Sequence, residues 1–174
     1  MEKIYHKLAP GLSRDLACQL GTEDRELVLN FFLTFSRLEC ALMKCGYSTG
    51  DEKRISIDWD KFADDNQHKF YELLDTYRNK ELKEAVEYYQ ENPPVKQVLI
   101  NGIVSLKPEV PKEELQFKEL INLVKRVRKN LLHGEKLSQL LSDDPERDRA
   151  LLQHGLVVLY TCIDVKTDLK QYFS

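Results

Sequence analysis

The segment from 126 to 134 reads Arg-Val-Arg-Lys-Asn-Leu-Leu-His-Gly and combines residue types that can act on a phosphodiester. A histidine, with an ordinary pKa of about 6.5, exchanges protons near neutrality, and an arginine stabilises negative charge on phosphate oxygens. RNA cleavage needs no further nucleophile, because the ribose 2′-hydroxyl attacks the phosphate while the histidine moves protons. His133 is therefore a candidate catalytic residue together with an arginine of this segment such as Arg128, and this chemistry requires no metal.

Four further residues are candidates for supporting roles around this pair: Arg126, Lys129, Asn130 and Asp148. On a continuous helix Arg126, Asn130 and His133 share one face, so Arg126 is the alternative to Arg128 as the catalytic arginine. Asp148 begins the last predicted helix and orients the imidazole if the preceding segment turns back tightly. A plain surface ion pair is the simpler interpretation of Asp148.

The spacing from arginine to histidine is not specific by itself, because the chain contains it a second time. Arg149 precedes His154 within the last predicted helix, where apolar residues flank the histidine. A packed or surface histidine is the better interpretation of His154. His133 differs because Gly134 follows it and can end a helix, and because cations surround it.

Basic residues are concentrated around the candidate segment. Between residues 118 and 136 six lysines and arginines accompany two glutamates, whereas the whole chain carries a net charge of -3. A confined basic strip on an acidic protein suits a specific anionic ligand better than bulk coating of nucleic acid. An ordinary solvated helix face is the alternative interpretation.

The periodicity of apolar residues predicts an all-α fold with four principal amphipathic helices in one domain spanning 1–174. The four regions are 22–46, 59–92 with breaks near 65 and 79, 111–131, and 144–173. Two short helical pieces are expected within 1–20, and a loop over 47–58. The Asn-Gly pair at 101 and 102 predicts a small hairpin or turn near 98–106.

Composition gives expectations about compartment and cofactors. The first residues carry charges where a signal peptide needs an apolar run, and no apolar run is long enough to cross a bilayer, so a cytoplasmic protein without membrane contact is expected. The cysteines lack the spacing of a metal site and are expected to be buried free thiols, with no metal and no cofactor. They are Cys18, Cys40, Cys45 and Cys162.

Residues 128–136, Arg-Lys-Asn-Leu-Leu-His-Gly-Glu-Lys, resemble the arginine-to-histidine motif of HEPN domains (higher eukaryotes and prokaryotes nucleotide-binding). The stretches 35–42 and 59–63 also resemble bacterial and phage members, so the resemblance covers about residues 23–172. It implies a HEPN-like helical bundle that dimerises with its motifs facing each other and forms one composite, metal-independent endoribonuclease site. By resemblance Arg128 stabilises the phosphate, His133 is the acid or base, and Asn130 is the polar residue of the motif.

The chain departs from the family pattern at two positions. Lys129 stands where asparagine or aspartate often follows the motif arginine, so it either weakens an orienting hydrogen bond or adds a phosphate contact. Glu135 stands where toxins controlled by a nucleotidyltransferase antitoxin have tyrosine, so adenylylation is not expected there.

The leading hypothesis is a homodimeric HEPN-type toxin or phage-defence ribonuclease, with RNA as substrate and an antitoxin or regulatory protein as a further partner. The main alternative is a non-catalytic HEPN module that binds a nucleotide, RNA or a protein. A structural helical adaptor is the least favoured class, because it leaves the cluster of arginine, asparagine and histidine without a role.

Overall fold

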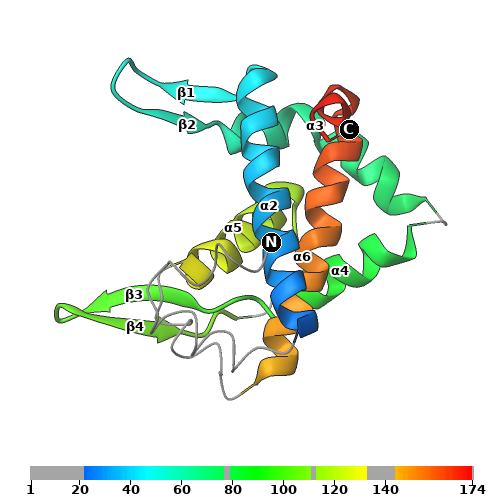
Figure 1. The fold of residues 1–174 in the computed structure, drawn as a ribbon. Helices are drawn as coiled ribbons and strands as arrows, with labels where there is room; N and C mark the ends of the chain where they lie inside the picture. Colours follow the sequence, from blue (N-terminus) through cyan, green and yellow to red (C-terminus); the bar gives the residue numbers. More distant parts are fainter. Residues whose placement is uncertain (1–21, 77–78, 111–112, 133–143, 174) are drawn as a thin grey trace.

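The computed structural model describes residues 22–76, 79–110, 113–132 and 144–173, and these residues are mostly helical (Figure 1). The helices are α2 (Thr22–Lys44), α3 (Trp59–Asp75), α4 (Lys80–Glu91), α5 (Phe117–Leu132), α6 (Pro145–Val165) and the 3-10 helix η2 (Thr167–Tyr172). The strands are β1 (Ser48–Gly50), β2 (Ile55–Ile57), β3 (Lys96–Ile100) and β4 (Ile103–Lys107). The helical pieces expected within 1–20 lie outside the described residues.

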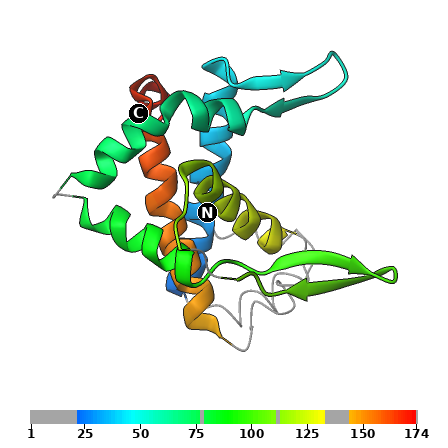
Figure 2. The same cartoon turned by 180° about the vertical axis from the view of Figure 1, so that it is seen from behind.

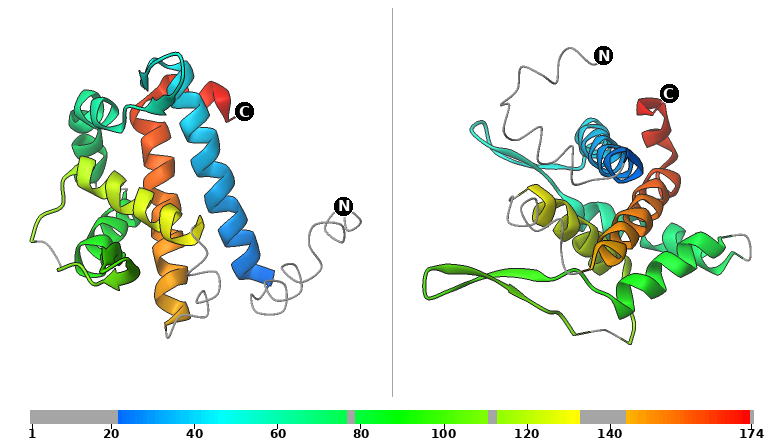
Figure 3. Two further views of the ribbon diagram at one scale, coloured as in Figure 1. Left: turned by 90° about the vertical axis from the view of Figure 1, so that its left-hand side faces the viewer. Right: turned by 60° about the horizontal axis from the view of Figure 1, so that its bottom comes forward.

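Helix α6 is the centre of the fold, because it contacts α2, α3, α4 and α5. Helices α2 and α6 run side by side in the same direction, and α5 crosses them (Figures 1 and 3). The antiparallel hairpins β1–β2 and β3–β4 project from one side of this helical body, and the carboxyl end of α5 lies between them (Figures 1 and 2). This arrangement places the basic segment of α5 at the base of the β3–β4 hairpin.

Several boundaries follow from local signals, as the sequence predicts. Helix α2 ends in a turn in which Gly46 has φ +83° and the Tyr47 amide donates to the Leu42 carbonyl, which is the pattern of a glycine-terminated helix. Helix α6 begins after Asp144, whose carboxylate accepts from the Arg147 amide at 2.9 Å. The β3–β4 turn has positive φ at Asn101 and at the glycine after it, as a two-residue hairpin requires.

The second predicted helical region consists of two helices, α3 and α4, so the four predicted regions contain five α-helices among the described residues. The break expected near 79 is confirmed, and the one near 65 is absent because α3 continues through it. Asn66, which is buried in the middle of α3, donates to the Phe62 carbonyl at 2.8 Å and to the Tyr47 hydroxyl at 3.2 Å. These bonds satisfy a polar residue that the sequence pattern alone would place at an interruption.

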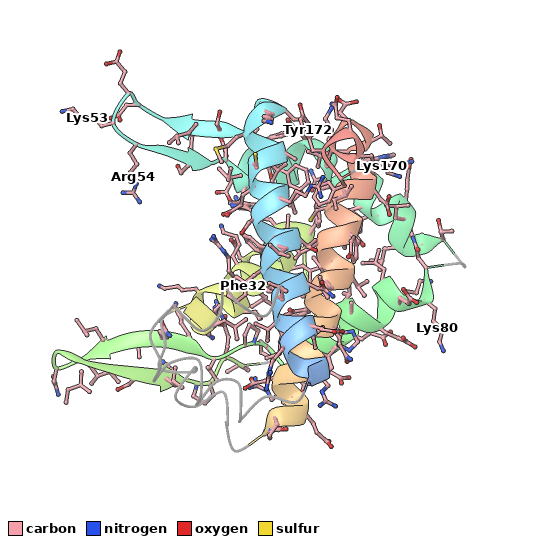
Figure 4. All side chains as sticks on the ribbon, in the orientation of Figure 1. Phe32, Lys53, Arg54, Lys80, Lys170 and Tyr172 are labelled. Carbon is pink, nitrogen blue, oxygen red and sulfur yellow. The ribbon has the colours of Figure 1, made fainter. Side chains whose placement is uncertain are left out.

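The loop expected over 47–58 contains the β1–β2 hairpin, so that expectation was also wrong. The Asp51 carboxylate accepts from the amides of Lys53 and Arg54 and closes the turn. Such an aspartate turn is a local signal, but the two strands beside it are only three residues long, so the sequence pattern did not indicate a hairpin. Lys53 and Arg54 lie at the tip of this hairpin, away from the helices (Figure 4).

Two helix ends differ from the sequence prediction because tertiary contacts override local propensity. Residues 113–116 are not helical, so α5 starts at Phe117 rather than near 111. Leu115 is buried in the core, and the Glu113 carbonyl accepts from Gln90 at 2.8 Å, so these tertiary contacts hold the stretch in a non-helical conformation. The last helix ends at Val165, and the 3-10 helix η2 follows it.

The core is one continuous cluster of aromatic and aliphatic side chains from helices α2 to α6 and the following η2. Phe70 and Phe117 stack with ring centroids 4.3 Å apart, which joins α3 to α5. Tyr89 of α4 is fully buried, its hydroxyl donates to the Leu151 carbonyl at 2.8 Å, and burial raises its pKa far above the ordinary value. Phe31, Phe35, Phe70 and Tyr89 are all buried in this core.

Gly155 of α6 packs tightly against Phe31 of α2 and Tyr89 of α4. A Cβ atom there would lie 2.8 Å from Phe31 Cε2 and 2.9 Å from the Tyr89 hydroxyl. We expect Gly155→Ala to lower the free energy of unfolding by about 1–2 kcal/mol, because overpacking outweighs the better helix propensity of alanine. Urea denaturation measures this, with the exposed neighbour Gln153→Ala as a control that should change stability by less than about 0.5 kcal/mol. An increase in stability for Gly155→Ala would contradict this packing.

The cysteine prediction holds only in part. Cys162 is buried, and burial raises its thiol pKa to about 12, whereas Cys40 is exposed and Cys45 is half-buried. Cys18 lies outside the described residues. Within the described part of the chain, no helix combines the length and apolarity that a membrane crossing demands.

Candidate nucleic-acid interface

An open groove of about 630 Å³ runs between α2, α5 and the start of β3, and we call it the basic groove. Five cationic side chains and one carboxylate line it, together with Phe35, Gln97, Asn122 and Asn130. The charged residues are Lys96, Lys125, Arg126, Arg128, Lys129 and Glu39. Four of the cations belong to the basic strip of residues 118–136, so this strip of α5 faces a hollow surface rather than a flat one.

Arg128 of α5 contacts the α2 wall of the groove. Its Nη2 and Nη1 atoms donate to the Glu39 carboxylate at 3.0 and 3.3 Å, and its guanidinium lies 4.8 Å from the centre of the Phe35 ring. A two-pronged pair and a ring contact fix the plane of the guanidinium. Arg128 therefore holds a rigid cation at the groove surface, with its charge countered by a carboxylate from a distant part of the chain.

Two opposing effects act on the pKa of Glu39. Burial raises its pKa above the ordinary value of 4.5, while Arg128 and Lys125 act in the opposite direction. Burial lowers the pKa of the Lys125 amine. This amine donates to Asn122 Oδ1 at 3.1 Å and lies 5.7 Å from the centre of the Trp59 ring. Burial thus partly desolvates Lys125, which strengthens the attraction of this amine for an anion.

Arg126 points away from Arg128 and has different partners. Its Nη1 donates to the Pro94 carbonyl at 3.1 Å and forms an ion pair with Glu109. Because the two arginines are two residues apart on a helix, their side chains leave in nearly opposite directions. The structure therefore separates the two alternative catalytic arginines, and only Arg128 adjoins Glu39 and Phe35.

Three side chains hold the segment Pro93–Val95, which leads into β3, and we call this arrangement the proline clamp. Arg147 Nη2 donates to the Pro93 carbonyl at 2.8 Å, and Asn130 Nδ2 donates to the Val95 carbonyl at 2.9 Å. Arg126 completes the set at Pro94. Prolines have no backbone donor, so the segment depends on these side chains. The proline clamp positions Lys96 and Gln97 over the groove.

Of the other predicted site residues, Lys129 and Asp148 are among the described residues and His133 is not. Lys129 is exposed on the groove, and Asp148 lines a small cavity of about 10 Å³ beside Asn130, between α5 and α6. His133 lies outside the described residues, one position after the last residue of α5. The structure therefore does not test the expected contact between Asp148 and His133.

His154, the second motif histidine, belongs to a different surface. Its ring stacks on Tyr88 with centroids 4.6 Å apart, and burial lowers its pKa although Glu84 raises it. It does not line the basic groove. This placement agrees with the interpretation of His154 as a packed histidine of the helical body.

Sequence reasoning missed Glu39, Lys96 and Gln97 as members of the site. Glu39 is 89 residues from Arg128, and nothing in the local pattern of α2 links the two. Lys96 and Gln97 lie just after two prolines, which have no backbone N–H to donate. These prolines were the one signal in the sequence that side chains must bind this segment.

Among the described residues, no group of three histidine, cysteine, aspartate or glutamate side chains is arranged to hold a metal ion. Comparisons with protein-family models, with curated protein sequences and with solved structures find no match to this chain.

Proposed function

We propose that this protein is a metal-independent endoribonuclease, with a HEPN-like helical bundle and a composite site of Arg128 and His133 at a homodimer interface. The basic groove is the observation that supports this best, because it collects four cations of the helix that immediately precedes His133, together with Lys96 of β3. A groove lined by cations suits the backbone of single-stranded RNA, whose phosphates supply most of the affinity.

Each residue has a distinct role in this proposal. Arg128, fixed by Phe35 and Glu39, stabilises charge on the phosphate, and His133 moves the proton of the 2′-hydroxyl or of the leaving oxygen. Lys125 and Lys129 bind neighbouring phosphates. Arg126 and Asn130 act through the proline clamp, so they position the hairpin instead of touching the reacting phosphate.

The homodimer and the toxin or phage-defence role come from the resemblance in the sequence. The β3–β4 hairpin supports a protein contact near the groove, because Leu99 and Ile103 are 71% and 69% exposed at its tip. A second copy or a regulatory protein would cover this surface. Light scattering on the purified protein measures whether two copies associate.

The deciding experiment incubates the purified protein with labelled single-stranded RNA in EDTA. We expect cleavage that leaves 2′,3′-cyclic phosphate ends, and we expect His133→Ala to slow it by about 10²- to 10⁴-fold, because the general acid or base is gone. His154→Ala is the matched control and should cleave at the rate of the unaltered protein, since it stacks on Tyr88 away from the groove. If His154→Ala loses cleavage and His133→Ala does not, His154 is the catalytic histidine and the proposed site is wrong.

A non-catalytic RNA-binding module is the second candidate, and the Arg128–Glu39 pair favours it. An arginine already bound by a carboxylate has less positive charge to offer a transition state. If the unaltered protein binds RNA in EDTA and leaves it intact, as His133→Ala does, this second function is correct.

A further inference from the structure

Three buried side-chain atoms without a hydrogen-bond partner stand out among the described residues, and all three belong to residues that line the basic groove. They are Gln97 Nε2, Arg128 Nε and Asn130 Oδ1. Native proteins pair nearly all buried polar atoms, so each exception calls for an explanation. Local departures from satisfied packing tend to mark functional sites. Their clustering at one groove therefore indicates a ligand that supplies the missing partners.

Asn130 is the most constrained of the three. Its side chain is only 3% exposed, and its Nδ2 atom is committed to the Val95 carbonyl at 2.9 Å. Turning the amide over would set its oxygen against that carbonyl oxygen, so Oδ1 is fixed as the free acceptor. Asn130 thus presents one acceptor of known identity at the groove.

Gln97 presents the complementary donor. It lies in β3, where it pairs across the hairpin with Leu106, and its half-buried side chain reaches the groove. The proline clamp immediately before β3 fixes the backbone that carries it, partly through Asn130 itself. The donor and the acceptor therefore come from two elements that are tied together, which is suitable for reading one rigid group.

We propose that Gln97 Nε2 and Asn130 Oδ1 form a nucleobase subsite in the basic groove, beside the cations that take the phosphates. This inference rests on the proposed function in that the ligand is single-stranded RNA. A base edge offers a donor beside an acceptor, and amide side chains recognise such edges through one bond of each kind. The groove volume of about 630 Å³ lies within the range of about 300–1,000 Å³ that is usual for ligand sites.

The phosphates and the base are then recognised by different residues. Lys125, Lys129 and Arg128 bind the backbone regardless of sequence, whereas Gln97 and Asn130 distinguish one base from another. Bases of single-stranded RNA can be splayed out and read on their hydrogen-bonding edges, which a double helix hides. The RNA that this groove selects is accordingly single-stranded and has a preferred base at one position.

The test measures binding of four fluorescent octaribonucleotides, A8, C8, U8 and alternating GU, to the full chain carrying His133→Ala, so that cleavage cannot interfere. We expect affinities that differ by about five- to 100-fold between the best and the worst RNA. Adding Gln97→Leu should reduce this ratio to less than about twofold, while the dependence of binding on salt stays the same. Gln97→Glu replaces the donor by an acceptor and should change the order of preference.

The matched control is Gln153→Leu, an exposed glutamine of α6, which should leave the preference unchanged. Gln97→Leu should fold at least as well as the parent protein, because it removes an unpaired buried donor. Equal affinities for all four RNAs, or a preference that survives Gln97→Leu, would overturn the subsite. A Gln97-dependent preference in a protein that never cleaves RNA supports the subsite and rejects the ribonuclease. Cleavage without a base preference supports the ribonuclease and overturns the subsite.

Discussion

Arg128→Ala is expected to slow RNA cleavage by about 10²- to 10³-fold, the loss typical for removal of one group that stabilises charge in a transition state. Arg128 is held in one plane by Glu39 and by the Phe35 ring, so its position is fixed before RNA arrives. Arg128→Lys keeps the charge but loses the two-pronged geometry, and it should recover only part of the rate. Single-turnover cleavage rates with saturating protein measure this effect.

Arg126→Ala is the matched comparison for Arg128→Ala. Its guanidinium is committed to the Pro94 carbonyl and to Glu109, so we expect a lower melting temperature and less than about a tenfold change in cleavage. Lys80→Ala provides a second control, because Lys80 pairs with Glu84 on the opposite side of the molecule from the hairpins (Figure 4). If Arg126→Ala abolishes cleavage in a folded protein while Arg128→Ala does not, Arg126 is the catalytic arginine.

Glu39→Gln is expected to tighten RNA binding by roughly five- to tenfold at neutral pH. A glutamine keeps a hydrogen bond to Arg128 but no longer competes with a phosphate for its charge. Two unit charges about 5 Å apart near a protein surface interact by about 3 kcal/mol, and screening leaves about 1 kcal/mol of this for binding. Fluorescence anisotropy in the His133→Ala background, at several salt concentrations, measures the change.

The pH dependence of binding has a defined direction. Since burial raises the pKa of Glu39, the folded protein takes up this proton at a higher pH than the unfolded chain does. The contribution of Glu39 to stability is therefore complete below its ordinary pKa of 4.5 and is lost as pH rises through the raised value. RNA binding should tighten over the same interval as pH falls, and Glu39→Gln should not show this tightening.

Two controls define what the Glu39 result means. Glu87→Gln removes an exposed carboxylate from α4 and should leave RNA binding unchanged. In a double-mutant cycle, the gain from Glu39→Gln should disappear when Arg128 is already alanine, because the carboxylate acts through that guanidinium. Weaker RNA binding by Glu39→Gln would show that the ion pair organises Arg128 rather than shielding it.

The elements that were predicted well are those with strong local signals. Helix α2 repeats apolar residues at helical spacing and ends at Lys44, shortly before Gly46. Helix α6 starts at Pro145, directly after its capping residue Asp144. The Asn-Gly turn at 101 and 102 specifies its hairpin through its positive φ angles. Prediction failed over 47–58 and at the start of α5, where an aspartate turn and the burial of Leu115 decide the conformation.

The sequence by itself determined which residues are the candidates for the proposed chemistry: a basic helix that leads into Asn130 and His133, within a mostly helical chain. It could do so because residue type, charge and helical spacing are local properties. Only the tertiary structure decided that Arg128 meets Glu39 and Phe35, that Arg126 turns to the proline clamp, and that β3 brings Gln97 to the groove. These contacts join segments far apart in the chain, and packing of the helices around α6 brings those segments together.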